Sequence, residues 1–423
     1  MNITLEKPVY GGDFLGHVEG KAVFVPLTLP GESVTAHIAE EKRSFTKAEL
    51  DTILTVSPNR IEPNCPHFGA CGGCHYQHVD YPTQLALKQQ ILRETLTRAN
   101  VSIPAEIGIL AGEPWAYRNR IRLALTREGE LAYRGRRSHD LIAIRTCPIA
   151  TPLLLRTATQ VAGFLSKNPS PIPVSELELF TNQNESELLL TLFTETALTS
   201  NTEEWLTSLQ SALQPQASGI RLQLNDGGLN PRILASIDQP SLNYTAAGFS
   251  YRVDHGAFFQ VNRHLIDDFV GLVTANHSGD LAWDLYAGVG LFARQLSARF
   301  AQVTAVESAP AAEAALLHNL ASTNASAISS STLDFLRRNR ELREPRPDFI
   351  ILDPPRAGLG DQVTTLLNAI HASAMVYVSC DPATLARDLR QLTQERYIVE
   401  NITLVDMFPQ TFHIETVVRL RRS

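Results

Sequence analysis

The sequence predicts an α/β protein in which residues 251–423 form a Rossmann-like, doubly wound domain after two smaller domains. The main observation is an alternation of short apolar runs with helical segments, the pattern of parallel βαβ units. The runs expected to form buried strands are residues 280–286, 302–307, 349–353 and 375–379. A turn-rich N-terminus predicts an OB-like β-barrel over residues 1–57, and a mixed middle part predicts a central α+β domain over 58–250.

The two smaller domains follow from local patterns. In the N-terminal part, glycine and proline turns separate three β-like runs, at residues 22–27, 33–39 and 47–56. Turn signals at this spacing are typical of a small barrel. In the central part, apolar residues recur on one side of a helix at 82–99, and that side is available to pack on the C-terminal domain. Strands are expected near 118–126 and 187–194.

Composition places the chain among ordinary globular proteins. It has 423 residues, 44% of them hydrophobic, and a formal net charge of −7. No apolar run approaches the roughly 20 residues that span a bilayer, so no membrane association is expected. The N-terminus lacks the basic and apolar segments of a secretion signal, and the few cysteines fit a reducing compartment. We therefore expect a cytoplasmic protein that acts as a monomer.

One stretch runs against the acidic average. Between Trp115 and Arg145, arginines recur and aromatic residues lie among them. Arg118, Arg120 and Arg122 stand at alternate positions, so on a strand their guanidinium groups share one face. Arginine offers a planar fork of donors to phosphate, and aromatic rings stack on bases, so this stretch predicts an RNA-binding face. A solvated strand face without a ligand explains the same pattern.

A glycine-bearing turn follows the first expected strand of the C-terminal domain. Within residues 284–293, Gly288 and Gly290 let the backbone turn tightly and approach a ligand closely. Glu307 ends the next strand, where a carboxylate can accept hydrogen bonds from both ribose hydroxyls. The combination predicts an adenosine-type cofactor, and it fits a nicotinamide dinucleotide as well as S-adenosylmethionine. A plain strand–turn–helix unit is the alternative.

Two later strand ends carry reactive groups. Asp353 is followed by two prolines, which stiffen the loop and keep its carboxylate at the carboxyl edge of the sheet. One strand further, Cys380 stands alone among polar residues at the same edge. A thiolate near backbone amides and cations is a competent nucleophile, so Cys380 is predicted to be catalytic. A buried structural cysteine is the alternative.

The other cysteines have metal-ligand spacing. They form a C-x5-C-x2-C pattern with a distant fourth member, at Cys65, Cys71, Cys74 and Cys147. In a reducing compartment such a group holds metal more often than a disulfide. Zinc and an iron–sulfur cluster fit the spacing equally. The nearby histidines that compete as ligands are His67, His75 and His78.

Five ordered motifs resemble those of the RNA uracil-5-methyltransferase family, at residues 258–262, 284–290, 352–356, 378–388 and 406–415. The similarity covers nearly the whole chain. The N-terminal barrel resembles the small OB-like TRAM domain that accompanies many members, and the cysteine quartet resembles their iron–sulfur site. The resemblance therefore implies a class I, S-adenosylmethionine-dependent methyltransferase domain, and a [4Fe–4S] cluster in preference to zinc.

The matched motifs imply roles for individual side chains. Cys380 matches the nucleophile and Glu415 the general base, and Phe258 matches an aromatic residue near the flipped base. Positions that match cofactor contacts are Gln260, Tyr286, Glu307, Asp353 and, at an acidic position near the adenine, Asp334. One departure is Leu291, since several members have an asparagine there whose amide hydrogen bond leucine cannot make.

The resemblance also implies an activity: transfer of a methyl group from S-adenosylmethionine to C5 of a uridine in RNA, through a covalent bond between the cysteine and C6. 23S rRNA is the preferred substrate, and tRNA is the alternative. A nicotinamide-dependent iron–sulfur oxidoreductase would have no use for Cys380 with Glu415, and a non-catalytic RNA-binding protein is a further class. An RNA cytosine-5-methyltransferase would need a second cysteine outside the quartet, and the sequence has none.

Overall fold

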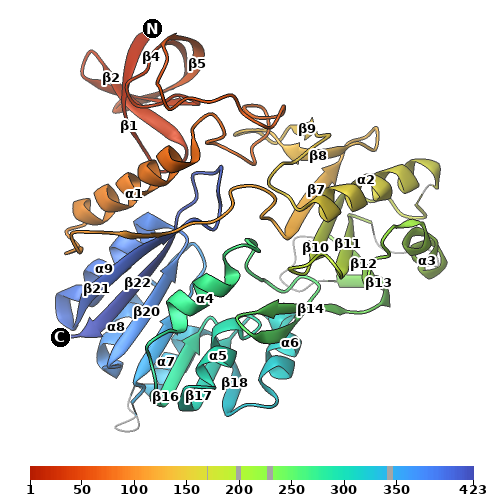
Figure 1. Ribbon diagram of the computed structural model, residues 1–423, viewed down its shortest axis with the longest axis vertical. Helices are drawn as coiled ribbons and strands as arrows, with labels where there is room; N and C mark the ends of the chain where they lie inside the picture. Colours follow the sequence, from red (N-terminus) through yellow and green to blue (C-terminus); the bar gives the residue numbers. More distant parts are fainter. Residues whose placement is uncertain (169, 197–201, 226–231, 341–345) are drawn as a thin grey trace.

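The computed structural model describes residues 1–168, 170–196, 202–225, 232–340 and 346–423. The N-terminal barrel stands at the top of Figure 1, with the central sheet at the right and the C-terminal sheet at the lower left. Five strands close the barrel in the order β1-β2-β3-β5-β4. They are β1 (Asn2–Pro8), β2 (Asp13–Val18), β3 (Lys21–Pro26), β4 (Ser33–Glu41) and β5 (Phe45–Thr55). Phe14, Val25 and Ala36 are fully buried inside it, and the predicted barrel is confirmed.

Seven strands form the central sheet, in the order β13-β12-β11-β10-β7-β8-β9. The strands and the two helices on them are β7 (Arg120–Leu125), β8 (Leu131–Arg134), β9 (Leu141–Ala143), α2 (Pro152–Lys167), β10 (Glu176–Thr181), β11 (Leu188–Thr194), α3 (Glu203–Ala212), β12 (Gly219–Leu224) and β13 (Arg232–Asp238). Leu123, Leu179 and Leu192 point to the face that α2 and α3 cover (Figure 1). The opposite face carries Phe180 and Phe193 against the arginines of β7.

The C-terminal domain is built on an eight-stranded sheet of order β18-β17-β16-β19-β20-β22-β21-β6. The strands are β6 (Gly108–Leu110), β16 (Gly279–Leu285), β17 (Phe300–Glu307), β18 (Ala325–Ser329), β19 (Phe349–Leu352), β20 (Ala374–Ser379), β21 (Tyr397–Val405) and β22 (Glu415–Arg422). Strands β16 to β20 run parallel, and β22 runs antiparallel to β20. The predicted doubly wound sheet is confirmed, and its strand order reverses between β16 and β19, the place where such sheets bind ligands.

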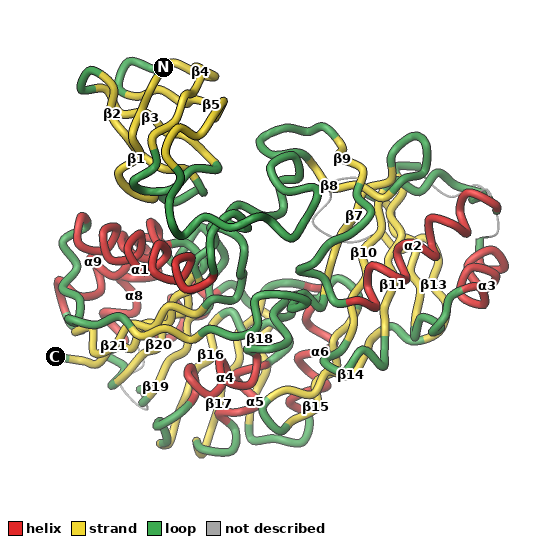
Figure 2. The backbone as a smooth tube through the Cα atoms, turned by 45° about the horizontal axis from the view of Figure 1, so that its top comes forward, coloured by secondary structure: helices red, strands yellow, loops and turns green. Residues whose placement is uncertain are grey.

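Helices cover both faces of this sheet, which explains why its parallel strands are apolar almost throughout. One face packs on α4 (Ile266–Thr274), α5 (Leu291–Leu296) and α6 (Pro310–Leu320). The other packs on α1 (Tyr81–Arg98), α7 (Thr332–Asn339), α8 (Gly360–Ile370) and α9 (Pro382–Glu395). Helices α1, α8 and α9 lie together on one side of the sheet in Figure 2. Among the described residues, no helix has the length and apolar character needed to cross a membrane.

Two segments within the range expected for the central domain pack on the C-terminal sheet. This packing was expected for the helix at 82–99 and was not expected for β6. Helix α1 packs on α9, and β6 extends the sheet by pairing with β21, with Gly108 opposite Thr403. The hairpin of β14 (Ser241–Ala246) and β15 (Phe249–Asp254) packs on α6. The expected boundary at residue 250 therefore runs through a hairpin. These segments pack where their apolar residues become buried, and their order along the chain does not show where that is.

A buried ion pair ties α1 to the loop between β21 and β22. Lys88 Nζ lies 2.6 Å from Asp406 Oδ1, and both side chains are fully buried. Lys88 also donates to the carbonyl oxygen of Phe408 (3.0 Å), and the Tyr81 hydroxyl donates to Asp406 Oδ2 (2.9 Å). Buried charges need a partner and hydrogen bonds in place of water. This loop is therefore anchored shortly before Glu415.

Lys88→Met is expected to lower the free energy of unfolding by about 3–5 kcal/mol, because it leaves Asp406 buried and unpaired. Urea unfolding of the purified protein measures this loss. The double variant Lys88→Met, Asp406→Leu should recover most of the stability, since both charges are then removed. Equal destabilisation of the single and double variants would contradict this view of the pair.

Candidate active site

One edge of the C-terminal sheet gathers most of the predicted cofactor and catalytic residues. They are Tyr286 after β16, Glu307 at the end of β17, Asp353 after β19 and Cys380 after β20. Because β22 is antiparallel, it begins at this edge, with Glu415. Ser379 pairs with Thr416 across β20 and β22, so Cys380 and Glu415 are neighbours.

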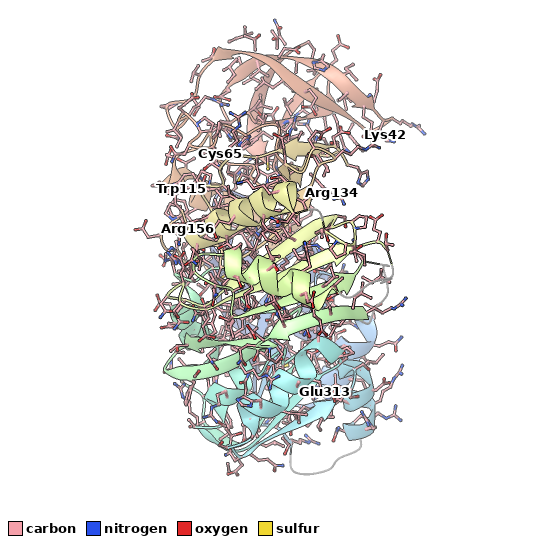
Figure 3. All side chains as sticks on the ribbon, turned by 90° about the vertical axis from the view of Figure 1, so that its right-hand side faces the viewer. Lys42, Cys65, Trp115, Arg134, Arg156 and Glu313 are labelled. Atoms are coloured by element: carbon pink, nitrogen blue, oxygen red, sulfur yellow. The ribbon has the colours of Figure 1, made fainter. Side chains whose placement is uncertain are left out.

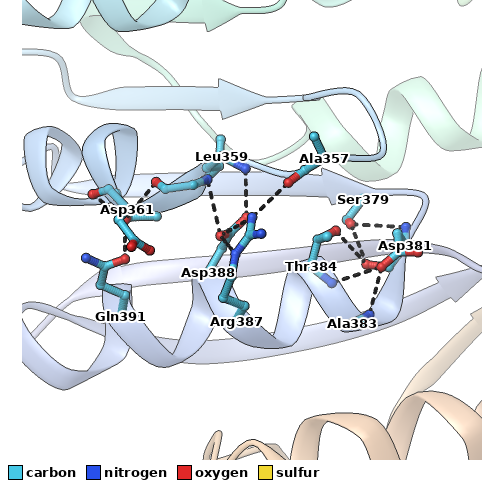
Figure 4. A network of polar contacts seen from close by, with 12 residues as sticks. Ala357, Leu359, Asp361, Ser379, Asp381, Ala383, Thr384, Arg387, Asp388 and Gln391 are labelled. Atoms are coloured by element: carbon cyan, nitrogen blue, oxygen red, sulfur yellow. Dashed lines mark hydrogen bonds and ion pairs between the residues drawn. The ribbon is translucent and has the colours of Figure 1, made fainter.

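Cys380 lies in the tight turn between β20 and α9, and Figure 4 shows its neighbours Ser379 and Asp381. Asp381 caps α9, since its Oδ1 accepts hydrogen bonds from the backbone N–H groups of Ala383 (3.0 Å) and Thr384 (2.9 Å). The hydroxyl of Ser379 donates to the carbonyl oxygen of Asp381 (3.1 Å). Such a cap satisfies the unpaired N–H groups at a helix start. The partly exposed Cys380 thiol therefore projects from a turn with fixed hydrogen bonds.

The loop after Asp353 is tied to the same helix. Asp388 of α9 is buried and accepts hydrogen bonds from the backbone N–H of Leu359 (2.7 Å) and from the hydroxyl of Tyr377 (2.8 Å) (Figure 4). The two strand ends that carry Asp353 and Cys380 are thus held relative to one another through α9.

The N-terminal barrel also reaches the turn that carries Cys380, which the sequence did not indicate. The Tyr10 hydroxyl donates to the carbonyl oxygen of Cys380 (3.3 Å). Its ring lies edge-on to Phe412, with 5.4 Å between centroids, and Phe412 also contacts His75 at 4.6 Å. The barrel, the cysteine loop and the loop that leads to Glu415 therefore meet around Phe412.

Burial perturbs the ionisable groups of this edge. It raises the pKa of Cys380 to about 11, with Glu415 and Asp353 adding to the rise and Arg356 opposing it. Burial, and then the charge of Glu307, raises the pKa of Asp353 to about 7. Burial and then Asp353 raise the pKa of Glu415 well above its usual range. Neighbouring buried carboxyls cannot all ionise together, so this edge can hold and move protons near neutral pH. Arg356 lies in the motif at residues 352–356, but the resemblance did not assign it a role.

At the same edge of the sheet lies a small cavity of about 30 Å³ whose lining includes Phe258, Gln260, Tyr286, Gly288 and Asp353. The glycine turn shapes it. Gly288 and Gly290 have left-handed backbones, with φ of 56° and 87°. The turn needs glycine at 290 because a Cβ there would lie 3.0 Å from the Leu316 side chain on α6. The predicted turn thus brings the backbone to the edge of the cavity.

A second cavity, of about 110 Å³, is lined by Glu307 and residues of α6 and β18. Glu307 Oε2 accepts a hydrogen bond from the backbone N–H of Gly288 (2.8 Å), and Oε1 accepts from those of Ser308 and Ala309 (both 2.6 Å). This carboxylate is therefore fixed between the two cavities, where a ribose can reach it.

Asp334 has a different setting. It lies in the first turn of α7, its side chain is 61% exposed, and it lies 3.6 Å from Arg337. Its Oδ2 accepts a hydrogen bond from the Ser331 hydroxyl (2.7 Å). It lines neither of the two cavities, so its contact with a cofactor stays a prediction.

The cysteine quartet lines one cavity of about 90 Å³. Its members are Cys65, Cys71 and Cys74 in the loop after the barrel and Cys147 in the loop after β9. Figure 3 shows Cys65 below the barrel and Arg134 of β8 at the end of the central sheet that faces the barrel. The backbone N–H of Gly72 donates to the carbonyl oxygen of Arg134 (3.0 Å), which holds the loop against β8. The four thiols form no disulfides.

The nearby histidines have other contacts. His78 Nε2 bonds to the carbonyl oxygen of Thr28 (3.1 Å), and His67 Nε2 accepts from the backbone N–H of Arg145 (3.1 Å). His75 packs on Phe412. Burial raises the pKa of the Cys74 thiol to about 12, and it raises that of Cys71 and Cys147 as well.

The three arginines of the predicted strip have separate environments. Arg118 precedes β7 and lines the cysteine cavity. Arg120 lies 4.1 Å from the Phe180 ring centroid and donates to the carbonyl oxygen of Ala257 (2.7 Å), next to Phe258. Arg122 is more exposed and pairs with Glu176. The alternating spacing correctly predicted that Arg120 and Arg122 lie on a strand, but it could not predict which residues they contact.

A larger cavity, of about 730 Å³, opens between the barrel, the cysteine loop and strands β7 and β8. The arginines that line it are Arg122, Arg134, Arg136 and Arg137. Two of them pair with acidic residues of the barrel, Arg136 with Glu49 and Arg137 with Asp13. Arg134, Arg136 and Arg137 belong to the arginine-rich stretch, but the sequence analysis predicted no individual role for them. The hairpin that brings them to this cavity is not evident from residue spacing.

A class I methyltransferase-type sheet with a cysteine at the end of β20 defines the class of protein, and comparisons with known proteins agree. Residues 80–423 match the model of the tRNA (uracil-5-)-methyltransferase family. The 23S rRNA (uracil(1939)-C(5))-methyltransferase RlmD of Pectobacterium carotovorum is 33% identical, over 96% of this chain and 90% of the relative. RlmD of Vibrio parahaemolyticus is 30% identical, over 100% of this chain and 96% of the relative.

Among solved structures, the tRNA (uracil-54, C5)-methyltransferase of Pyrococcus abyssi, in complex with S-adenosyl-L-homocysteine, has the same fold. Its TM-score is 0.79 at 23% identity, and the match covers 99% of this chain and 100% of that one. The chain belongs to the tRNA (uracil-5-)-methyltransferase family.

Proposed function

We propose that this protein transfers a methyl group from S-adenosylmethionine to C5 of a uridine in RNA, in 23S rRNA by preference. The observation that carries the proposal is the placement of Cys380 beside Glu415, next to the cavity at the glycine turn. A nicotinamide oxidoreductase needs no such pair, and neither does a protein that only binds RNA.

The chemistry assigns a step to each of these side chains. The Cys380 thiolate adds to C6 of uracil, which makes C5 a nucleophile. C5 would then take the methyl group of S-adenosylmethionine, and the S–CH3 bond would break with its electron pair remaining on the sulfur of S-adenosylhomocysteine, which leaves. The ionised Glu415 then accepts the C5 proton, and the C6–S bond breaks with its electron pair returning to sulfur. Arg356 favours the thiolate, since its charge opposes the rise in the pKa of Cys380 that burial causes.

The target uridine has to leave its stack before Cys380 can reach C6. Phe258 is 64% exposed beside the cofactor cavity, so its ring is available to an unstacked base. The arginine-lined cavity beneath the barrel offers guanidinium groups to the surrounding phosphates. Loops and shape, more than groove reading, would then select the RNA.

The preference for ribosomal RNA is supported by the names of the curated relatives, and the tRNA alternative by the names of the family model and the solved structure. Incubation with S-adenosylmethionine and either 23S rRNA or tRNA, followed by mass mapping, tests the choice. 5-Methyluridine in the rRNA alone is expected. Methylation of tRNA alone would overturn the rRNA preference, and no 5-methyluridine in either would overturn the activity.

The cysteine quartet is proposed to hold a [4Fe–4S] cluster, with zinc as the alternative. Zinc needs sulfurs about 2.3 Å from one centre. The four cysteines line one cavity of about 90 Å³, and four thiolate ligands are the set that a [4Fe–4S] cluster needs. The cluster would cross-link the cysteine loop to the loop after β9, and methyl transfer requires no electrons from it.

Glu307→Ala is expected to weaken S-adenosylmethionine binding about 10- to 100-fold, because charge-assisted hydrogen bonds to a ribose contribute about 1.5–3 kcal/mol each. Calorimetry measures the affinity. Asp334→Ala tests the second acidic position, and a loss there would confirm its predicted contact. Asp268→Ala, exposed on α4, is the control. Unchanged affinity of Glu307→Ala would remove Glu307 from the binding site.

A further inference from the structure

A cation without a carboxylate partner lies against the cysteine cavity. Arg118 lines the cavity together with Gln77 and Tyr133. Its Nε is buried and has no hydrogen-bond partner. The groups that act most on its charge are the hydroxyls of Tyr117 and Tyr133 and the thiol of Cys74, and no carboxylate is among them.

The neighbouring arginines on the same segment are satisfied differently. Arg122 pairs with the carboxylate of Glu176. Arg120 also has buried nitrogens without a partner, Nε and Nη2, but it donates to the carbonyl oxygen of Ala257 and its guanidinium carbon lies 4.1 Å from the Phe180 ring centroid. The aromatic rings near Arg118 are more distant, with its guanidinium carbon 5.9 Å from the Tyr117 centroid and 6.0 Å from that of Phe408. Ring contacts at that distance add little and do not replace a counter-anion. Of the three arginines, Arg118 is the one whose charge faces the cysteines.

A buried cation is costly unless an anion accompanies it. A [4Fe–4S] cluster held by four thiolates is such an anion, and its net negative charge grows by one on reduction. A fixed positive charge at its side therefore stabilises the bound cluster, and it stabilises the reduced form more than the oxidised form.

We infer that Arg118 is the counter-cation of the cofactor held by the cysteine quartet. It acts as a positioning residue for that group, in place of the RNA contact that the arginine alternation predicts. The inference rests on the iron–sulfur cluster proposed above. It also explains why a guanidinium with an unpaired nitrogen lines the same cavity as four thiols.

The test compares Arg118→Met, which removes the charge, with Arg118→Lys, which keeps it. Arg122→Met, at an exposed position paired with Glu176, is the matched control. Each full-length variant is reconstituted anaerobically with iron and sulfide. The measurements are iron and sulfide content, the midpoint potential, and the rate of cluster loss to a chelator. Binding of S-adenosylhomocysteine shows that the C-terminal domain is folded.

Arg118→Met is expected to lower the stability of the reduced cluster relative to the oxidised cluster about tenfold. The midpoint potential should therefore become ~59 mV more negative. It should also lose its cluster several-fold faster, while the Lys and Arg122 variants stay near the parent. A parent-like potential and loss rate in Arg118→Met would overturn the inference. Weaker RNA binding with an unchanged cluster would do so too, since it would make Arg118 an RNA contact. If the parent holds zinc or no cofactor, this inference and the cluster fail together, whereas uridine methylation is tested separately.

Discussion

Cys380→Ala should abolish methyl transfer, with a fall in turnover of about 10⁴-fold or more. Without the thiol, no bond to C6 can form, and C5 of uracil stays too weak a nucleophile to take the methyl group. Methylation of the preferred RNA under single-turnover conditions measures the loss. Cys380→Ser should behave almost the same, because a serine hydroxyl in this setting has no base that would deprotonate it for attack.

Binding of S-adenosylhomocysteine serves as the control for the Cys380 variants. The cofactor cavity is lined by residues of the glycine turn and the loop at Phe258, and Cys380 is not among them. Affinity near that of the parent would show that the sheet edge is intact. A Cys380→Ala variant that methylates RNA at the parent rate would contradict the assigned nucleophile.

Glu415→Gln should let the covalent adduct form and then stop, with turnover reduced about 10²- to 10⁴-fold. Glutamine has the same shape and no charge, so it cannot accept the C5 proton that has to leave before sulfur is released. Denaturing gels should therefore show a protein–RNA complex with ordinary uridine RNA, in which the C5 methyl group is already present.

The matched control is Glu400→Gln, on the exposed part of β21, where Glu400 pairs with Arg421. That variant should form no stable adduct and keep its turnover. If Glu415→Gln released 5-methyluridine as fast as the parent, the base would have to be another group, and the buried Asp353 would be the next candidate.

The parts of the fold that local patterns determine could be predicted from the sequence. Alternating apolar strands and helices gave the doubly wound sheet, and turn spacing gave the barrel. The edge that unites Glu307, Asp353 and Cys380 follows from one rule, that the carboxyl ends of parallel strands lie together. Glu415 joins them because β22 is antiparallel, which no local pattern indicates.

Contacts between distant segments could not be predicted in this way. Strand β6 joins the C-terminal sheet by pairing with β21, although it precedes the central domain in the chain. Tyr10 reaches Cys380 across 370 positions of sequence. The pairing of Lys88 with Asp406 likewise has no signal in either segment, since a single lysine in a helix usually faces solvent.

The arginine stretch shows where alternation stops being informative. Period-two spacing says which side chains share a face of a strand, but the neighbours on that face come from other parts of the chain. Arg120 packs on the ring of Phe180, and Arg122 forms an ion pair with Glu176, both on β10. Arg118 lines the cavity of the cysteine loop. One pattern in the sequence thus corresponds to three different environments.

The most direct test of the account uses RNA in which 5-fluorouridine replaces uridine. Fluorine at C5 cannot leave as a proton, so the covalent intermediate should accumulate after methyl transfer. The parent protein is incubated with this RNA and S-adenosylmethionine, denatured, digested and analysed by mass spectrometry. The account predicts a modified nucleotide on the peptide that contains Cys380. A nucleotide on any other peptide, or active methylation of normal RNA with no adduct to the fluorinated one, would contradict it.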